Sequence, residues 1–150
     1  MMPARDLQVH QEGVSQVRCI YPTLVAANDQ AKHSHFDPMT GRFIRQKTDT
    51  YPFKNIFIEE FSSVEEKTAG GPFQAMLDGC ALLCHYYPEE HKVVWTHLNT
   101  QSINIIFSML RRNEVCMKMV SNGDYTTKGY AIPIAHYTQQ LGNLCEVHSL

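Results

Sequence analysis

The spacing of hydrophobic and polar residues becomes regular from residue 54 onward. Lys54 to Phe61 is rich in β-branched and aromatic residues, which predicts a strand. Apolar residues then recur every three or four positions from Pro72 to Tyr87, as on one face of a helix, and Pro88 is expected to end that helix. Lys92 to Leu98 is almost continuously apolar, which is typical of a strand covered on both faces.

The C-terminal third predicts a second helix and a hairpin. A favourable N-cap, Asn99 or Thr100, precedes a helix that is expected to reach Arg112. Strands are expected over Glu114–Val120 and Tyr125–His136. The Asn-Gly pair between them supplies the positive φ angles that a tight hairpin turn needs.

The two ends of the chain carry weaker patterns. Val14–Ile20 predicts a strand, and Thr23–Gln30 a short helical turn. Residues 32–50 predict a polar loop with a short edge strand over Arg42–Gln46. Residues between Leu141 and His148 predict a short terminal helix or a tail.

This order of elements predicts an α/β fold. Strands that are joined by single helices pair in parallel through right-handed crossovers, so we expect a mixed sheet with a parallel βαβαβ core. Helices would pack on the sheet, and an antiparallel C-terminal hairpin would lie at its edge. We expect a single domain over residues 1–150, with an irregular part at 1–50, a core at 54–136 and a short helix or tail at 137–150.

Composition and charge are those of an ordinary globular protein. Hydrophobic residues make up 43% of the 150, and 13 basic residues face 15 acidic ones. The near balance argues against a nucleic-acid partner, which normally requires a basic face. No apolar run approaches the ~18–20 residues that span a bilayer, so we expect no membrane partner.

The cysteines and the N-terminus predict a cytoplasmic or nuclear protein that is not secreted. The first twenty residues include Asp6 and Glu12 and lack the apolar centre of a signal peptide. The five cysteines are odd in number and mostly far apart in the chain, which predicts reduced thiols.

Two loops are candidates for binding a small anionic ligand. In open α/β sheets ligands bind beyond the carboxyl ends of parallel strands, where helix N-termini favour anions. No nucleotide-binding glycine motif occurs, so no cofactor is predicted, and the same residues would serve equally well to cap helices and turn the chain. The candidate residues are Ser62, Ser63, Thr68, Gly70, Gly71, Thr96, His97, Asn99 and Thr100.

A thiol hydrolase is the alternative. Cys80 follows a glycine, Gln74 precedes it by six residues, and His136 lies downstream in an expected strand. This spacing is similar to that of papain-like cysteine hydrolases, which implies Cys80 as nucleophile, His136 as base and Gln74 as oxyanion donor. That family's C-G-x-C-[WY] pattern is absent, and the apolar periodicity places Cys80 inside a helix, facing the core.

Two weaker candidates involve metals. His33, His35 and Asp37 are superficially similar to the H-x-H-x-D motif of the metallo-β-lactamase fold, but Pro38 replaces the next histidine and the chain is too short. A lone zinc or nickel site and a solvated loop both remain open. Asp49 with Glu59 or Glu60 resembles the acidic pairs of magnesium nucleases, without the lysine that follows the glutamate in those enzymes.

We therefore expect a small intracellular α/β domain that binds a protein partner or a small anionic ligand. Pro133 removes a backbone donor from the strand at 125–136, which predicts an edge strand. Such an edge offers a surface for a partner or a second copy of the chain. The state of Cys80 separates this binding role from the hydrolase: a binding domain buries it, and an enzyme exposes it in a cleft.

Overall fold

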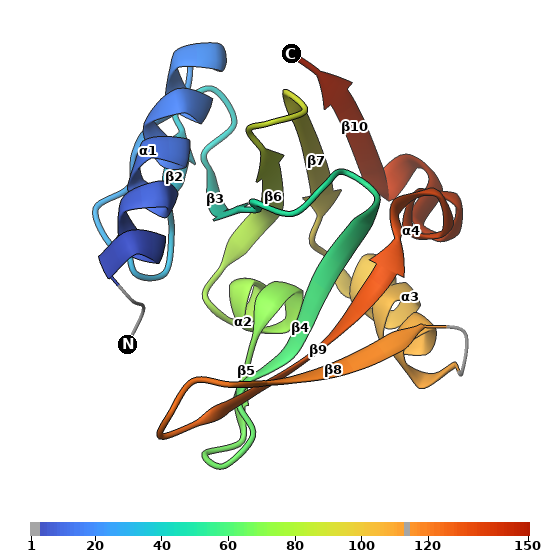
Figure 1. Cartoon of the computed structure of the whole chain (residues 1–150). Helices are drawn as coiled ribbons and strands as arrows, with labels where there is room; N and C mark the ends of the chain where they lie inside the picture. The colour runs from blue at the N-terminus through green and yellow to red at the C-terminus, as the bar shows by residue number, and fades with distance from the viewer. Residues whose placement is uncertain (1–3, 113–114) are drawn as a thin grey trace.

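Two β-sheets and four α-helices make up residues 4–112 and 115–150, which the computed structural model describes (Figure 1). The first sheet has six strands, and only its central pair, β3 and β6, is parallel. In spatial order the strands are β1 (Val25–Ala26), β2 (His35–Asp37), β3 (Arg42–Thr48), β6 (Cys80–Tyr87), β7 (Lys92–His97) and β10 (Cys145–Ser149).

The second sheet has four strands and is antiparallel throughout. In spatial order they are β5 (Thr68–Ala69), β4 (Asn55–Ser63), β9 (Thr126–Pro133) and β8 (Cys116–Ser121).

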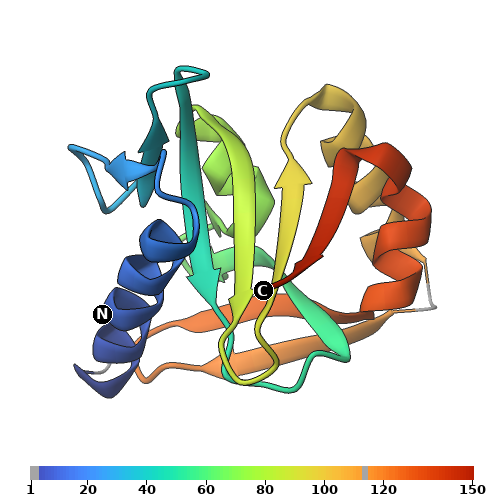
Figure 2. The same ribbon diagram turned by 90° about the horizontal axis from the view of Figure 1, so that it is seen from above.

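The helices lie around the two sheets. α1 lies beside β3, whereas α3 and α4 lie together at the opposite end of the six-stranded sheet (Figure 2). Their bounds are α1 (Ala4–Ile20), α2 (Gly71–Leu77), α3 (Thr100–Arg111) and α4 (Ile134–Leu141), and the short 3-10 helix η1 (Gly142–Leu144) joins α4 to β10. Within the described part of the chain, no helix is both long and apolar enough to cross a bilayer.

The six-stranded sheet is covered on both faces. On one face, Val17 of α1 packs with Cys84, Tyr86 and Trp95. On the other face, side chains of β6 and β7 share a larger core with the second sheet, α3 and α4; its members include Ile56, Ile58, Tyr87, Val94, Ile106, Ile132 and Tyr137. This double cover explains the continuous apolar runs in β6 and β7, because each strand buries both of its faces.

The prediction of an α/β fold with a mixed sheet is confirmed, but the βαβαβ core is not. β4 lies in the second sheet, and β6 and β7 form an antiparallel hairpin. The parallel pair joins β3 to β6, and β4, β5 and α2 connect them. The rule that strands joined by a single helix pair in parallel applies to strands of one sheet, whereas β4 and β6, which α2 joins, lie in different sheets.

The single helix predicted from Pro72 to Tyr87 is wrong in its second half. α2 ends at Leu77, Gly79 has a φ of +81°, and β6 begins at Cys80. A glycine in this conformation ends the helix at no steric cost. Because both faces of β6 are buried, its apolar pattern also fits a helical period.

The predicted edge strand at 125–136 is also wrong. β9 lies between β4 and β8, and Pro133 is its last residue, immediately before α4. Proline at a strand end interrupts no ladder, so it gives no information about the edge. The exposed edge of this sheet is β8, whose six residues are all exposed.

Several weaker predictions at the chain ends fail as well. Residues 14–20 belong to α1, and the expected helical turn at 23–30 contains β1 instead. The predicted strand at 42–46 forms, but as part of the internal strand β3. The expected terminal helix over 141–148 is replaced by the end of α4, η1 and β10.

The locally encoded elements are confirmed. The predicted strands at 54–61 and 92–98 correspond to β4 and β7, and the predicted second helix to α3. β8 and β9 form the predicted hairpin, with Gly123 at a φ of +87° in the turn. Residue 114, the first of one predicted strand, lies outside the described residues.

Candidate functional site

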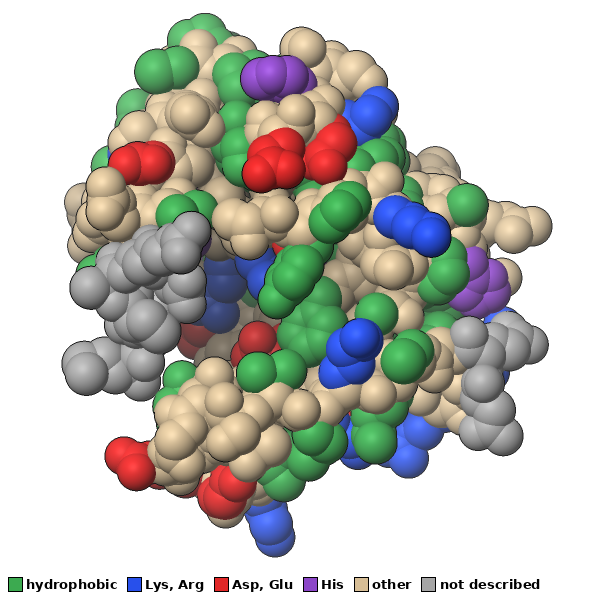
Figure 3. Space-filling view, in the orientation of Figure 1, with side chains coloured by type: hydrophobic (Ala, Val, Ile, Leu, Met, Phe, Trp, Pro, Cys, Tyr) green, Lys and Arg blue, Asp and Glu red, His purple; other side chains and the backbone are tan. Residues whose placement is uncertain are grey.

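A cavity of about 660 Å³ lies between β3 and β6 of the first sheet, β4 of the second and α1. The space-filling view shows a hollow on this side of the molecule, with basic and acidic side chains inside it (Figure 3). Its volume is within the range of small-molecule sites in proteins. Arg45 and Lys47 are the basic residues of its wall, and Asp49, Glu59 and Glu89 are the acidic ones.

Lys47 is the central cation of this cavity. Its Nζ lies 4.5 Å from the centroid of the Phe57 ring, which projects from the facing sheet. Among the described residues Lys47 has no hydrogen-bond or ion-pair partner. Burial lowers its pKa, and the carboxylates of Asp49 and Glu59 oppose that change. The part of the Lys47 side chain that stays accessible lines the cavity.

Two carboxylates complement this amine. Burial raises the pKa of Glu59, which forms no hydrogen bond or ion pair with any described residue. Burial also raises the pKa of Asp49, and one of its oxygens accepts a hydrogen bond from the Tyr51 N–H at 3.0 Å. The site therefore holds a basic and an acidic group that both lack a direct partner in the described chain.

His85 adds a neutral acceptor. It is paired in register with Lys47 on the parallel strands, and burial lowers its pKa to about 3. Its ring donates one hydrogen bond to the backbone of Phe57. The other ring nitrogen, Nδ1, is buried and has no partner in the described part of the chain. An unpaired buried nitrogen is costly unless a ligand or water supplies a donor.

Sequence reasoning identified only part of this site. Asp49 and Glu59 were paired as metal ligands, and the structure does bring both to the cavity wall. No group of three potential metal-ligating side chains occurs among the described residues, however. Lys47 and His85 were missed because residues 32–50 read as a loop and residue 85 as part of a helix. The available signal was a charged residue at every second position, Arg45, Lys47 and Asp49.

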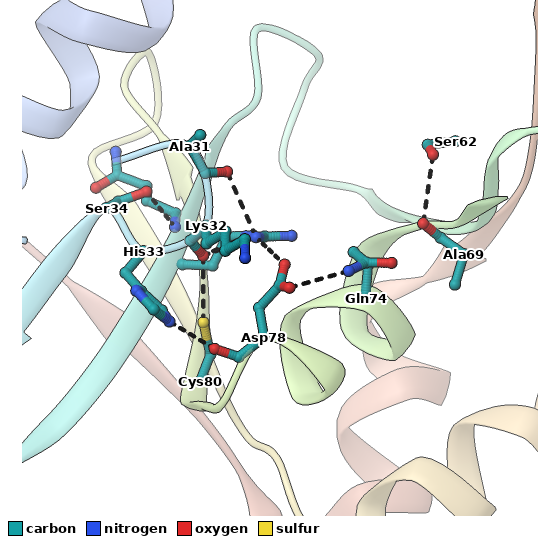
Figure 4. A network of polar contacts seen from close by, with 11 residues as sticks. Ala31, Lys32, His33, Ser34, Ser62, Ala69, Gln74, Asp78 and Cys80 are labelled. Carbon is teal, nitrogen blue, oxygen red and sulfur yellow. Dashed lines mark hydrogen bonds and ion pairs between the residues drawn. The ribbon is translucent and has the colours of Figure 1, made fainter. Parts of the chain in front are cut away.

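Cys80 lies outside the cavity, in a separate polar network (Figure 4). It is the first residue of β6 and is buried, and its Sγ donates to the Lys32 carbonyl at 3.4 Å. Burial raises the pKa of the thiol to about 11, so it is protonated at neutral pH. The side-chain amide of Gln74 donates to the Asp78 carboxylate at 3.1 Å rather than pointing to the thiol as an oxyanion donor would.

The papain-like arrangement is not assembled in this structure. His136 lies on α4, whose main contacts are with α3, β4, β9 and β10, whereas Cys80 packs with Ala75, Leu83 and Leu98. The histidine on the strand next to Cys80 is His97, because the β6–β7 register pairs Leu82 with His97. The ring of His97 lies 3.2 Å from the Glu146 carboxylate.

The nine candidate anion-binding residues serve mainly as turns and caps. The Ser62 hydroxyl donates to the carbonyls of Thr68 and Ala69, and the Asn99 side chain accepts from the Ser102 N–H at the start of α3. The Thr96 hydroxyl is buried against that of Tyr137. Of the nine, only Gly71 lines the cavity.

The three candidate metal ligands point to separate partners. His33 Nε2 contacts the Asp78 carbonyl oxygen at 2.5 Å, and His35 Nε2 contacts the Gln46 side chain at 2.6 Å. Asp37 accepts from the Met39 N–H and the Thr40 hydroxyl in a tight turn. The three side chains therefore bind different neighbours and do not converge on a shared metal position.

All five cysteines are free thiols in the structure. Neither a protein-family model nor a curated protein nor a solved structure shows significant similarity to this chain.

Proposed function

We propose that the cavity binds a small zwitterionic molecule, one that carries both an anionic oxygen and a hydrogen-bond donor. The observation that carries this proposal is the pair of opposite charges on facing sheets, Lys47 and Glu59, neither of which forms a hydrogen bond or a close ion pair with a described residue. A carboxylate on the ligand would complement the amine, and an ammonium or amide N–H would complement the carboxylate. The Nδ1 atom of His85 would accept a further donor.

The charges of the wall favour a zwitterion over a simple anion. Among the described residues of the wall, the acidic residues outnumber Arg and Lys by three to two, and Arg45 is already paired with Asp78 at 2.6 Å. A purely anionic ligand would meet more repulsion than attraction once it had paired with Lys47. The proposed ligand class is therefore narrower than the small anionic ligand expected from the sequence, because it must carry a positive group as well.

The test is a comparison of matched probes. Glycine, β-alanine and 4-aminobutyrate separate their two charges by increasing lengths, whereas acetate and methylamine carry one charge each. We expect one of the zwitterions to raise the melting temperature and to bind in calorimetry, and the single-charge probes to have little effect. Lys47→Met should abolish the shift, and Lys54→Met, at an exposed lysine, should preserve it. If no zwitterion binds, or if Lys47→Met binds as well as the parent protein, the proposal is wrong.

A further inference from the structure

The start of β6 is covered by a segment that precedes β2 in the chain. Residues 29–34 run across this end of the six-stranded sheet, and the Lys32 carbonyl accepts from the Cys80 thiol. Within the segment, the Lys32 and His33 N–H groups both donate to the Asp29 carbonyl, at 3.1 and 2.7 Å. The segment is therefore one hydrogen-bonded turn that lies over the thiol (Figure 4).

The Arg45 side chain makes three of the hydrogen bonds that hold this segment, to the carbonyls of Ala31 and Lys32. Arg45 of β3 donates to the Lys32 carbonyl from Nε at 2.9 Å and from Nη2 at 2.7 Å. The same guanidinium is 2.6 Å from the Asp78 carboxylate, between α2 and β6. Arg45 thus joins the covering segment to Asp78, which lies two residues before Cys80 in the chain.

The surroundings of Asp78 support this arrangement. Burial raises the pKa of Asp78, but hydrogen bonds from Gln74 and Arg45 outweigh that effect and the net pKa is lowered, so the carboxylate stays charged. His33 adds a second attachment, from its Nε2 to the Asp78 backbone carbonyl. The end of the segment is also fastened to β3, because the Ser34 N–H donates to the Ile44 carbonyl at 2.8 Å and the Ser34 hydroxyl oxygen accepts from the Gln46 N–H at 3.0 Å. The ring of His33 lies 4.3 Å from that of Phe43.

We propose that residues 29–34 form a strap over the start of β6, and that the ion pair between Arg45 and Asp78 is its clasp. When the clasp opens, the strap lifts as a unit and exposes the Cys80 thiol while the sheet stays folded. Arg45 also lines the ligand cavity, but neither Cys80 nor residues 29–34 are among the described residues of its wall, so the inference goes beyond the proposed zwitterion site. It holds whether or not Cys80 takes part in catalysis.

The test follows the accessibility of two cysteines on the same strand. Cys80 lies beneath the strap, whereas Cys84 is fully buried against α1 and reports global unfolding. Arg45→Gln removes the clasp's charge with little change in size. We expect it to raise the rate of Cys80 alkylation by iodoacetamide at least tenfold and to leave Cys84 protected. Asp78→Asn should have a smaller effect in the same direction, and Arg111→Gln, on the last turn of α3, should have none.

Two results would overturn the strap. One is an unchanged Cys80 rate in a folded Arg45→Gln protein, and the other is a parallel rise of Cys80 and Cys84, which means global unfolding. Hydrogen exchange on the unmutated protein gives a reading that does not depend on how the variants fold. The amides of Lys32, His33 and Ser34 should exchange together, faster than those of β3 and β6. Exchange of these three amides at the strand rate would also refute the strap.

Discussion

The ammonium of Lys47 and the ring of Phe57 join the two sheets across the cavity, 4.5 Å from Nζ to ring centroid. The Phe57 ring packs on Gly129 of the neighbouring strand β9, where a β-carbon would come within 2.8 Å of three ring carbons. A glycine is therefore required beneath the ring for steric reasons. The ring that faces Lys47 across the cavity is therefore placed by a contact within the second sheet.

Gly129→Ala should displace the Phe57 ring and lower stability. Overpacking of this kind typically costs about 1–3 kcal/mol. Urea denaturation should show the loss, and the double variant Phe57→Leu/Gly129→Ala should recover part of it, because a smaller side chain leaves room for the methyl group. A Gly129→Ala protein as stable as the parent would contradict the close contact.

Tyr137 and Thr96 form a buried hydrogen bond of 2.6 Å between their hydroxyls, and both residues are fully buried. Tyr137→Phe leaves the Thr96 hydroxyl without its partner, so we expect a loss of about 1–2 kcal/mol in the free energy of unfolding. In the Tyr137→Phe protein, the further substitution Thr96→Val should lower the free energy of unfolding by less than the same substitution does in the parent protein. Tyr51→Phe, at an exposed tyrosine, is the control and should change little. Additive effects of the two buried substitutions would argue against the bond.

His85 should make the protein sensitive to acid. Its pKa is about 3 in the folded protein, against 6.5 for the unfolded chain, so it takes up a proton on unfolding whenever the pH lies between these values. Its contribution is fully present above pH 6.5 and is lost as the pH falls toward 3. The full difference is on the order of 5 kcal/mol. The raised pKa values of Asp49 and Glu59 act in the opposite direction and make the net slope shallower.

Denaturation at a series of pH values measures this slope. His85→Gln should flatten it, and His148→Gln, at an exposed histidine, should leave it unchanged. If the His85→Gln protein loses stability with acid as steeply as the parent, His85 is not the group responsible.

Asn99 should stabilise α3 as its N-cap. Its side chain accepts from the Ser102 N–H at 2.9 Å, and the Ser102 hydroxyl accepts from the Asn99 N–H at 3.0 Å, which completes a capping box. Asn99→Ala should lower the free energy of unfolding by about 1 kcal/mol. Asn104→Ala, at an exposed position inside the same helix, should be neutral or slightly stabilising because alanine favours helix. Equal effects of the two substitutions would refute the capping role.

The elements that the sequence predicted correctly are those with local causes. Asn99 caps a helix through a residue three positions away, and the Asn122-Gly123 turn closes a hairpin between adjacent strands. The region at 80–87 failed for the opposite reason. Its apolar run fits a helix and a doubly covered strand equally, and the choice depends on α1 and the second sheet packing on its two faces.

The candidate site was predictable only in fragments. Asp49 and Glu59 stood out as acidic residues, but nothing local showed that Lys47 and His85 would join them, because β3 and β6 are separated by more than thirty residues and pair in parallel. The burial of Cys80 likewise depends on Lys32, which lies 48 positions earlier in the chain.

By itself, the sequence determined where helix α3, strands β4 and β7 and the β8–β9 hairpin form, because capping, turn chemistry and residue preference act over a few positions. The tertiary structure decided which strands pair, which strand is the exposed edge, and which charged groups face one another across the cavity. Those outcomes depend on contacts between distant segments, whose energies no local pattern contains.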